Sequence, residues 1–259
     1  MIYVCIPSHN EAPTVGLLLW RIRQVFTGFP REYQLLVGDD GSDDATSEVL
    51  APYARVLPLT VLRSEARQGY ARTVEGLLRH AEQRTDRPKR DCAILMHADF
   101  THGPHFLPEL VRRIDGGADL VVGEGLLQGE PSRGHRVLRR WAPLLLRRRV
   151  GVPGVHDVVS GFLALRLATL RSAMRELDGP LLRCDNWAAN AELIGRVGRH
   201  ARRVETVPTV ERRDLRTRQT RLDPWAEARS LWQARSELRL PPYARREGPA
   251  AEREPELVS

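Results

Sequence analysis

The sequence is poor in cysteine, in aromatic residues and in long apolar runs. Its 259 residues include 3 cysteines, which lie far apart and form no Cys-x-x-Cys pair, so neither a disulfide framework nor a cysteine-based zinc site is expected. The longest apolar runs, such as residues 17–20 and 142–146, fall far short of the roughly 18 to 20 residues that a membrane-spanning helix needs. The N-terminus reads as a strand without a basic leader, so we expect no signal peptide and a cytoplasmic protein.

Positive charge is abundant but unevenly distributed. The chain has 40 basic and 33 acidic residues, and all the basic ones except Lys89 are arginines. Residues 1–130 have a formal charge of −4, whereas residues 131–259 have +11. No nucleic-acid-binding module is recognisable, and the aromatic residues, 6% of the chain, do not alternate with the basic ones. We therefore expect no nucleic-acid partner.

Short apolar runs alternate with amphipathic stretches, which predicts an α/β fold with a mostly parallel central sheet flanked by helices. Strands are expected at residues 2–6, 33–37, 56–63, 92–96, 119–122, 156–165 and 203–210. Helices are expected at residues 14–26, 44–53, 70–82, 105–114, 185–197 and 224–238. We expect a single domain over residues 1–240, with halves 1–123 and 124–240, followed by a disordered tail at 241–259.

Four aspartates follow the second predicted strand, namely Asp39, Asp40, Asp43 and Asp44. A helix N-cap needs only one of them. The first two stand at the carboxyl end of a strand, where open α/β sheets bind ligands. They can hydrogen-bond a nucleobase and ribose hydroxyls there, although an ordinary turn and cap is the alternative explanation.

Further motifs occur in a fixed order along the chain. They are Pro7-Ser8-His9-Asn10-Glu11, Gly69-Tyr70-Ala71-Arg72-Thr73, His97-Ala98-Asp99, Asp157-Val158-Val159-Ser160-Gly161-Phe162 with Arg166, then Glu192 and Glu205-Thr206-Val207-Pro208. Together with the aspartates, this series resembles the family 2 inverting glycosyltransferases of GT-A fold. Its later part is most similar to the polyprenol- or dolichol-phosphate mannosyltransferase branch. The resemblance covers residues 1–222 and is more specific than any single motif.

The resemblance implies a role for each matching residue. A UDP- or GDP-linked sugar would be held by Pro7, Asn10, Glu11, Asp39, Asp40, His97 and Ala98. Asp99 and His97 would ligate Mg²⁺ or Mn²⁺, which stabilises the charge that develops on the leaving diphosphate. Contacts with phosphate and acceptor would come from Ser160, Gly161, Arg166, Arg213, Arg216 and Arg221. The implied reaction is inverting transfer of a hexose from the nucleotide-diphosphate sugar.

His97 departs from the family pattern, which has Asp-Ala-Asp at this point, and Thr101 stands where mannosyltransferases often have Gln. An imidazole can ligate Mn²⁺ or hydrogen-bond the ribose, and it can equally weaken metal binding. A zinc site made from His97, Asp99, His102 and His105 is a weaker alternative, because their spacing matches no known ligand pattern.

The acceptor that we prefer is a polyprenyl phosphate. A phosphate is already anionic, so its attack needs positioning but no strong general base. A hydroxyl acceptor would need a base, for which the candidate catalytic residues, besides Asp99, are Asp157, Asp185 and Glu192.

The basic amphipathic stretch from Arg136 to Arg149 suits an anionic membrane surface, although it can equally pack on the sheet. Peripheral contact with the inner membrane face is therefore a hypothesis.

Three other functions remain open at this point. A glycosyltransferase that acts on a soluble small-molecule or sugar acceptor in specialised metabolism needs no membrane contact. A nucleotidyltransferase shares the nucleotide-binding sheet but normally begins with a glycine-rich basic loop, unlike residues 7–11. A non-catalytic nucleotide-sugar-binding protein would be consistent with His97.

Overall fold

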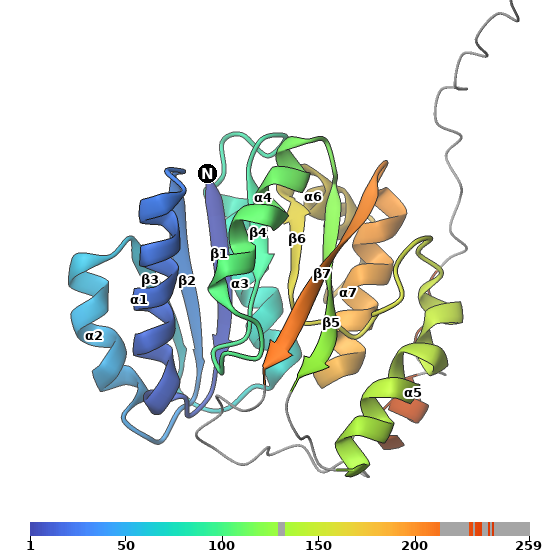
Figure 1. The fold of residues 1–259 in the computed structure, drawn as a ribbon, viewed down its shortest axis with the longest axis horizontal. Helices are drawn as coiled ribbons and strands as arrows, with labels where there is room; N and C mark the ends of the chain where they lie inside the picture. Colours follow the sequence, from blue (N-terminus) through green and yellow to red (C-terminus); the bar gives the residue numbers. More distant parts are fainter. Residues whose placement is uncertain (129–132, 213–227, 230, 235–237, 239, 241–259) are drawn as a thin grey trace, which may run out of the picture.

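The computed structural model describes residues 1–128, 133–212, 228–229, 231–234, 238 and 240. Its centre is a seven-stranded sheet with helices on both faces (Figure 1). The strands are β1 (Ile2–Ser8), β2 (Tyr33–Asp40), β3 (Leu59–Ser64), β4 (Cys92–Leu95), β5 (Leu120–Gln128), β6 (Leu163–Arg166) and β7 (Val204–Arg212). The helices are α1 (Ala12–Gly28), α2 (Thr46–Val56), α3 (Tyr70–Arg84), η1 (Pro104–Phe106), α4 (Leu107–Asp115), α5 (Arg133–Val150), α6 (Leu167–Arg175) and α7 (Asn186–His200).

The sheet has the strand order β3-β2-β1-β4-β6-β5-β7. Every neighbouring pair is parallel except those of β6, which runs antiparallel to both β4 and β5. The predicted mixed α/β fold with a mostly parallel sheet is therefore confirmed. From β1 the chain builds β2 and β3 on one side and β4 on the other. Such a switch in strand order leaves a crevice at the carboxyl ends of the strands, where α/β proteins bind ligands.

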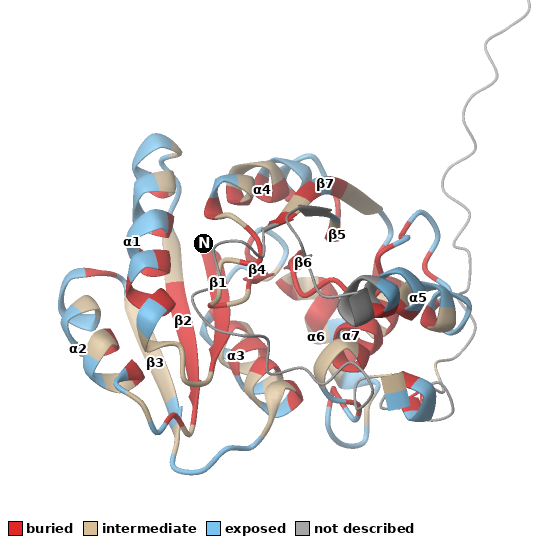
Figure 2. Cartoon of the chain, turned by 60° about the horizontal axis from the view of Figure 1, so that its bottom comes forward, coloured by how far each residue is buried: buried red, intermediate tan, exposed pale blue. Residues whose placement is uncertain are grey.

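Two apolar clusters fill the space between the sheet and its helices. In α1 the buried residues Val15, Leu18, Ile22 and Phe26 recur every three or four positions, so one face of the helix packs on the sheet. This cluster also takes in α2 and α4, and a second cluster takes in α3, α5, α6 and α7. In Figure 2 the central strands and the inward helix faces are largely buried, the edge strand β3 is of intermediate burial, and the outward helix faces are exposed. The strand ends are thus held by a rigid framework.

Several predicted boundaries are wrong. The strand expected at 156–165 is confined to β6, and residues 157–162 form turns and bends instead. The strand expected from residue 56 begins at Leu59, because α2 continues to Val56. Helix α6 was not predicted. The expected tail at 241–259 lies outside the described residues, as does most of the expected helix at 224–238, of which 228–229 and 231–234 are helical.

No helix in the described part of the chain is long and apolar enough to cross a membrane.

Candidate functional site

A pocket of about 180 Å³ lies at the carboxyl ends of β1, β2 and β4. It is the crevice expected at the switch in strand order. The strands β1 and β4 are neighbours, but the chain leaves β1 toward β2 on one side of the sheet and leaves β4 toward β5 on the other. Its walls come from segments far apart in the sequence. The lining residues are Pro7, Ser8, His9, Glu11, Asp40, Arg67, Tyr70, Thr73, His97, Ala98, Asp99 and Asn186.

The adjacent residues Asp39 and Asp40 have different surroundings. Asp40 lines the pocket, and its two carboxylate oxygens accept hydrogen bonds from the backbone N–H groups of Gln68 and Gly69, at 2.6 and 3.0 Å. Asp39 is fully buried, accepts a hydrogen bond from Ser47 Oγ at 2.8 Å and lies outside the pocket lining. The structure therefore brings Asp40 to the candidate site and uses Asp39 to hold the loop after β2.

The loop after β1 is similarly divided. Pro7 and Glu11 line the pocket, whereas Asn10 does not. Asn10 has a positive φ of 54° and exchanges hydrogen bonds with the loop after β2: its N–H donates to Ser42 Oγ at 2.9 Å, and its Oδ1 accepts from the N–H of Asp43 at 2.9 Å. Asn10 thus joins the two loops that form this side of the pocket, and its predicted contact with a nucleotide stays a prediction.

His97 and Asp99 lie together on the loop that follows β4. Asp99 Oδ1 accepts hydrogen bonds from Thr101, from its N–H at 3.0 Å and from its hydroxyl at 2.5 Å. The ring of His97 stacks on Tyr70 with the centroids 5.6 Å apart. A Cβ atom at position 161 would lie 2.0 Å from His97 Nε2, so only glycine admits the imidazole there. Gly161 therefore does not line the pocket itself but lies against His97, which does.

The side chains of the pocket fit a divalent cation that takes some of its ligands from a phosphate of the substrate. Within the described residues, no group of three or more His, Cys, Asp or Glu side chains is arranged to hold a metal ion. The zinc alternative therefore has no support there. Asp99 and His97 line the same pocket as two further carboxylates, those of Glu11 and Asp40. Mg²⁺ sites commonly use one or two carboxylates together with the phosphates of the substrate.

Three predicted catalytic carboxylates lie outside the lining of this pocket. Asp157 accepts a hydrogen bond from the N–H of Gly125 at 3.4 Å, and Asp185 accepts one from the N–H of Ala71 at 2.8 Å, in the first turn of α3. Glu192 is buried, and its oxygens accept from the N–H groups of residues 183 and 184 and from the Arg196 guanidinium. These contacts favour structural roles, so base catalysis by any of the three stays a prediction.

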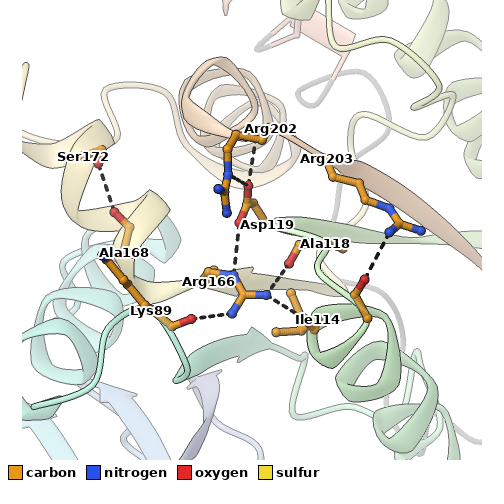
Figure 3. Close-up of polar contacts among 10 residues, drawn as sticks. Lys89, Ile114, Ala118, Asp119, Arg166, Ala168, Ser172, Arg202 and Arg203 are labelled. Atoms are coloured by element: carbon orange, nitrogen blue, oxygen red, sulfur yellow. Dashed lines mark hydrogen bonds and ion pairs between the residues drawn. The ribbon is translucent and has the colours of Figure 1, made fainter. Parts of the chain in front are cut away.

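Arg166 lies at the opposite end of the sheet from the pocket, and its predicted contact with phosphate or acceptor stays a prediction. Arg166 stands opposite Cys92, the first residue of β4. Its guanidinium donates to Asp119 Oδ1 at 3.1 Å and to the carbonyl groups of Lys89, Ile114 and Ala118, as Figure 3 shows. Arg166 therefore joins β6 to β5 and to the loop before β4, far from the strand ends that form the pocket.

For two other predicted groups, the contact with phosphate or acceptor also stays a prediction. Ser160 is buried, donates its hydroxyl hydrogen to the carbonyl of Gly123 at 2.6 Å and accepts from the N–H of Phe162 at 3.2 Å, so it fastens the start of β6 to β5. Arg213, Arg216 and Arg221 lie outside the described residues.

Several lining residues had no predicted role, namely Ser8, His9, Arg67, Tyr70, Thr73 and Asn186. His9 Nδ1 lies 2.8 Å from the carbonyl oxygen of Asp40. Tyr70 donates its hydroxyl hydrogen to Asn190 Oδ1 at 2.8 Å, and burial raises its pKa, so it stays neutral. Arg67 is an exposed residue in a wall that also carries carboxylates. Tyr70 and Thr73 stand in a motif noted in the sequence, whereas nothing distinguished Arg67 from the other arginines.

Comparison with known families decides what kind of protein this pocket belongs to. The model of glycosyl transferase family 2 matches residues 3–171, which contain both the β1 loop and the β4 loop. The chain belongs to glycosyl transferase family 2.

Relatives within this family include archaeal proteins. Over 168 residues, 63% of the chain, the sequence is 28% identical to a dolichol-phosphate mannosyltransferase of Pyrococcus furiosus, and the match spans 45% of that protein. Over 229 residues, 86% of the chain, it is 28% identical to a dolichyl-phosphate hexose transferase of Haloferax volcanii, of which 87% is covered.

Among solved structures, the chain is similar to glucosyl-3-phosphoglycerate synthase of Mycobacterium tuberculosis in complex with Mn²⁺, UDP and glucosyl-3-phosphoglycerate. The TM-score is 0.61 at 21% identity, and the match covers 90% of this chain and 76% of that one. The predicted GT-A fold of this family 2 member is confirmed.

Proposed function

We propose that this family 2 member transfers a hexose, with inversion, from a nucleotide-diphosphate sugar to a polyprenyl phosphate. The observation that carries the proposal is the pocket at the carboxyl ends of β1, β2 and β4, whose lining includes three carboxylate residues, two histidines and one arginine. The two relatives named above are a dolichol-phosphate mannosyltransferase and a dolichyl-phosphate hexose transferase, which supports a lipid-phosphate acceptor.

The donor, UDP- or GDP-linked, is assigned to the half 1–123, which supplies all the lining residues of the pocket except Asn186. Asp99 and His97 would hold Mg²⁺ or Mn²⁺, which supplies Lewis-acid stabilisation of the leaving diphosphate. Arg67 would bind phosphate oxygens through its guanidinium, whose paired N–H donors match their geometry. These groups bind and orient the diphosphate before the sugar is transferred.

The acceptor is assigned to the half 124–240. The three carboxylates considered as general bases accept hydrogen bonds from backbone N–H groups and do not line the pocket. An acceptor that must lose a proton would need a base within reach, whereas a phosphate is already anionic. This arrangement supports a phosphate acceptor over a hydroxyl.

Helix α5 offers a surface for the membrane in which such an acceptor would lie. It buries Leu138, Ala142, Leu146 and Val150 against the core, and it contains no acidic residue. On its outward side Val137, Trp141 and Leu144 are exposed by 57, 57 and 55%. Exposed apolar residues on an arginine-rich helix suit an anionic lipid surface. The helix begins close to the end of the sheet where β5 and β7 finish (Figure 1), which is also the end that carries the pocket.

A transfer assay followed by mass spectrometry tests the reaction. The purified chain is incubated with UDP- and GDP-sugars and a short polyprenyl phosphate, with Mn²⁺, with Mg²⁺ or with chelator, and Asp99→Asn serves as the inactive comparison. We expect a glycosyl phospholipid only with metal and not with the variant. Release of nucleotide without a lipid product would replace the lipid acceptor by a soluble one. Nucleotide-sugar binding without turnover would overturn the proposal in favour of a binding protein.

Vesicle co-sedimentation tests the surface of α5. We expect the chain to bind vesicles that contain anionic phospholipid, and the double variant Trp141→Ser/Leu144→Ser to bind them about ten-fold more weakly. Trp20→Ser is the matched control, because Trp20 on α1 is also exposed, by 42%. Equal losses in the double variant and the control would contradict the assignment to α5.

A further inference from the structure

A buried histidine and a buried glutamate face each other behind the Asp99 loop. His102, three residues after Asp99, is 1% exposed, and Glu211, near the end of β7, is 3% exposed. His102 Nε2 lies 3.9 Å from Glu211 Oε1. The same two residues also form an isolated antiparallel bridge through their backbones. The pair therefore joins the loop after β4 to the last strand of the sheet.

The surroundings of the pair fit both side chains closely. The ring of His102 stacks on Phe162, with the centroids 4.9 Å apart and an angle of 15° between the planes. On the other side, a Cβ atom at position 125 would lie 2.7 Å from Glu211 Cγ, so glycine at 125 makes room for the carboxylate side chain. Burying two ionisable groups is costly and contributes little to stability compared with apolar packing. A role beyond filling the core is therefore indicated.

The pair is connected to Asp99 by short steps. Asp99 Oδ1 accepts two hydrogen bonds from Thr101, the residue that precedes His102. At the start of the loop His97 rests against Gly161, and at its end His102 rests against Phe162, which is the next residue in the chain. Two histidines thus bracket Asp99 and rest on adjacent residues of one segment.

We propose that His102 and Glu211 are positioning residues: together they hold the Asp99 loop against β7 and so fix the carboxylate that would hold the cation next to the donor diphosphate. The inference rests on the donor site proposed above. Beyond Glu211 the chain runs directly into the segment with Arg213, Arg216 and Arg221. The pair therefore ties the Asp99 loop to the strand that leads into the arginines expected to contact phosphate.

Nucleotide binding as a function of Mn²⁺ concentration tests this inference by calorimetry, with UDP and GDP as probes. In Glu211→Gln and in His102→Asn we expect the Mn²⁺ concentration for half-maximal effect to rise about ten-fold, while binding without metal stays as in the unchanged chain. Because the residues act as a pair, the double variant should be no worse than the more impaired single variant. Asp119→Asn is the matched control, since Asp119 is an equally buried carboxylate at the other end of the sheet.

The outcomes separate the inference from the proposed function. If the unchanged chain shows no Mn²⁺-dependent binding of either nucleotide, the proposed function fails, and this inference fails with it. If that binding is present but Glu211→Gln and His102→Asn keep the normal Mn²⁺ requirement, or lose metal-free binding to the same extent, the inference alone is overturned. Hydrogen exchange of the Thr101 amide, which needs no metal, should be faster in both variants than in Asp119→Asn, and unchanged exchange would also overturn it.

Discussion

His97 and Gly161 are in direct contact across the candidate site, where a Cβ atom at 161 would lie 2.0 Å from His97 Nε2. The contact joins the loop after β4 to the segment before β6. It explains why the imidazole can stand next to Asp99 although it is larger than the aspartate of the family pattern.

Gly161→Ala should therefore displace His97. Overpacking of this kind typically costs about 1 to 3 kcal/mol, and because the displaced ring lies in the pocket, we expect donor binding to weaken about ten-fold or more. Calorimetry with UDP and GDP in the presence of Mn²⁺ measures this. Gly76→Ala is a suitable control, since no atom would lie within 4 Å of its Cβ. Unchanged binding in Gly161→Ala would contradict the contact.

His97→Asp should relieve the effect of Gly161→Ala. The shorter side chain does not reach Gly161 and restores the Asp-Ala-Asp sequence that the resemblance leads us to expect. We predict that His97→Asp keeps or raises metal-dependent turnover, and that the double variant is more active than Gly161→Ala alone. A large loss of turnover in His97→Asp would mean that the imidazole has a role of its own.

Arg67→Ala should weaken donor binding, because it removes the guanidinium from a pocket wall that carries carboxylates. Charge-assisted hydrogen bonds are worth about 1.5 to 3 kcal/mol each, so a ten-fold or larger rise in the donor Kd is expected. Arg72→Ala, an exposed arginine in the first turns of α3 that does not line the pocket, is the control. If the two variants bind the donor equally weakly, the weaker binding reflects the loss of one positive charge and not a contact made by Arg67.

Asp119→Ala should destabilise the fold. Asp119 is buried and accepts hydrogen bonds from Arg166 at 3.1 Å and from the Arg202 N–H at 2.9 Å. Removing one partner of a buried ion pair costs about 3 to 5 kcal/mol, and urea unfolding followed by circular dichroism measures it. Since this network lies far from the pocket, the folded fraction should bind nucleotide normally. Loss of binding without loss of stability would contradict the structural role assigned to Arg166.

The thiols should react slowly in the folded chain. Burial raises the pKa of Cys92 to about 12 and also raises that of Cys5, so near pH 8 hardly any thiolate is present to react. Cys184 is buried as well. A thiol-specific disulfide reagent should label none of the 3 cysteines rapidly until guanidinium is added, and then all of them. Fast labelling of the native chain would contradict this burial.

Much of the candidate site could be predicted from the sequence, because parallel strands bring their carboxyl ends to one edge of the sheet. That rule gathers Pro7, Asp40 and Asp99 without any knowledge of side-chain contacts. The rule does not separate Asp39 from Asp40. Neighbouring residues of a strand point to opposite faces, and only the packing of α3 and α1 on those faces decides which carboxylate lines the pocket.

The position of Arg166 away from the pocket could not be predicted for a different reason. Apolar periodicity marks a strand but not its direction, and β6 is the strand that runs antiparallel to both its neighbours. Its first residues lie near the pocket, so its last residue, Arg166, lies at the far edge of the sheet. Arg67 was missed because nothing in an arginine-rich sequence distinguishes the one guanidinium that a loop brings to a pocket.

The membrane contact proposed for the exposed face of α5 has a consequence for kinetics. A chain that rests on a bilayer through Trp141 and Leu144 meets a lipid acceptor by diffusion in two dimensions. Its rate then follows the mole fraction of acceptor in the membrane, and adding inert lipid at constant total acceptor slows the reaction. For this protein, surface dilution would become as important a variable as the concentration of donor.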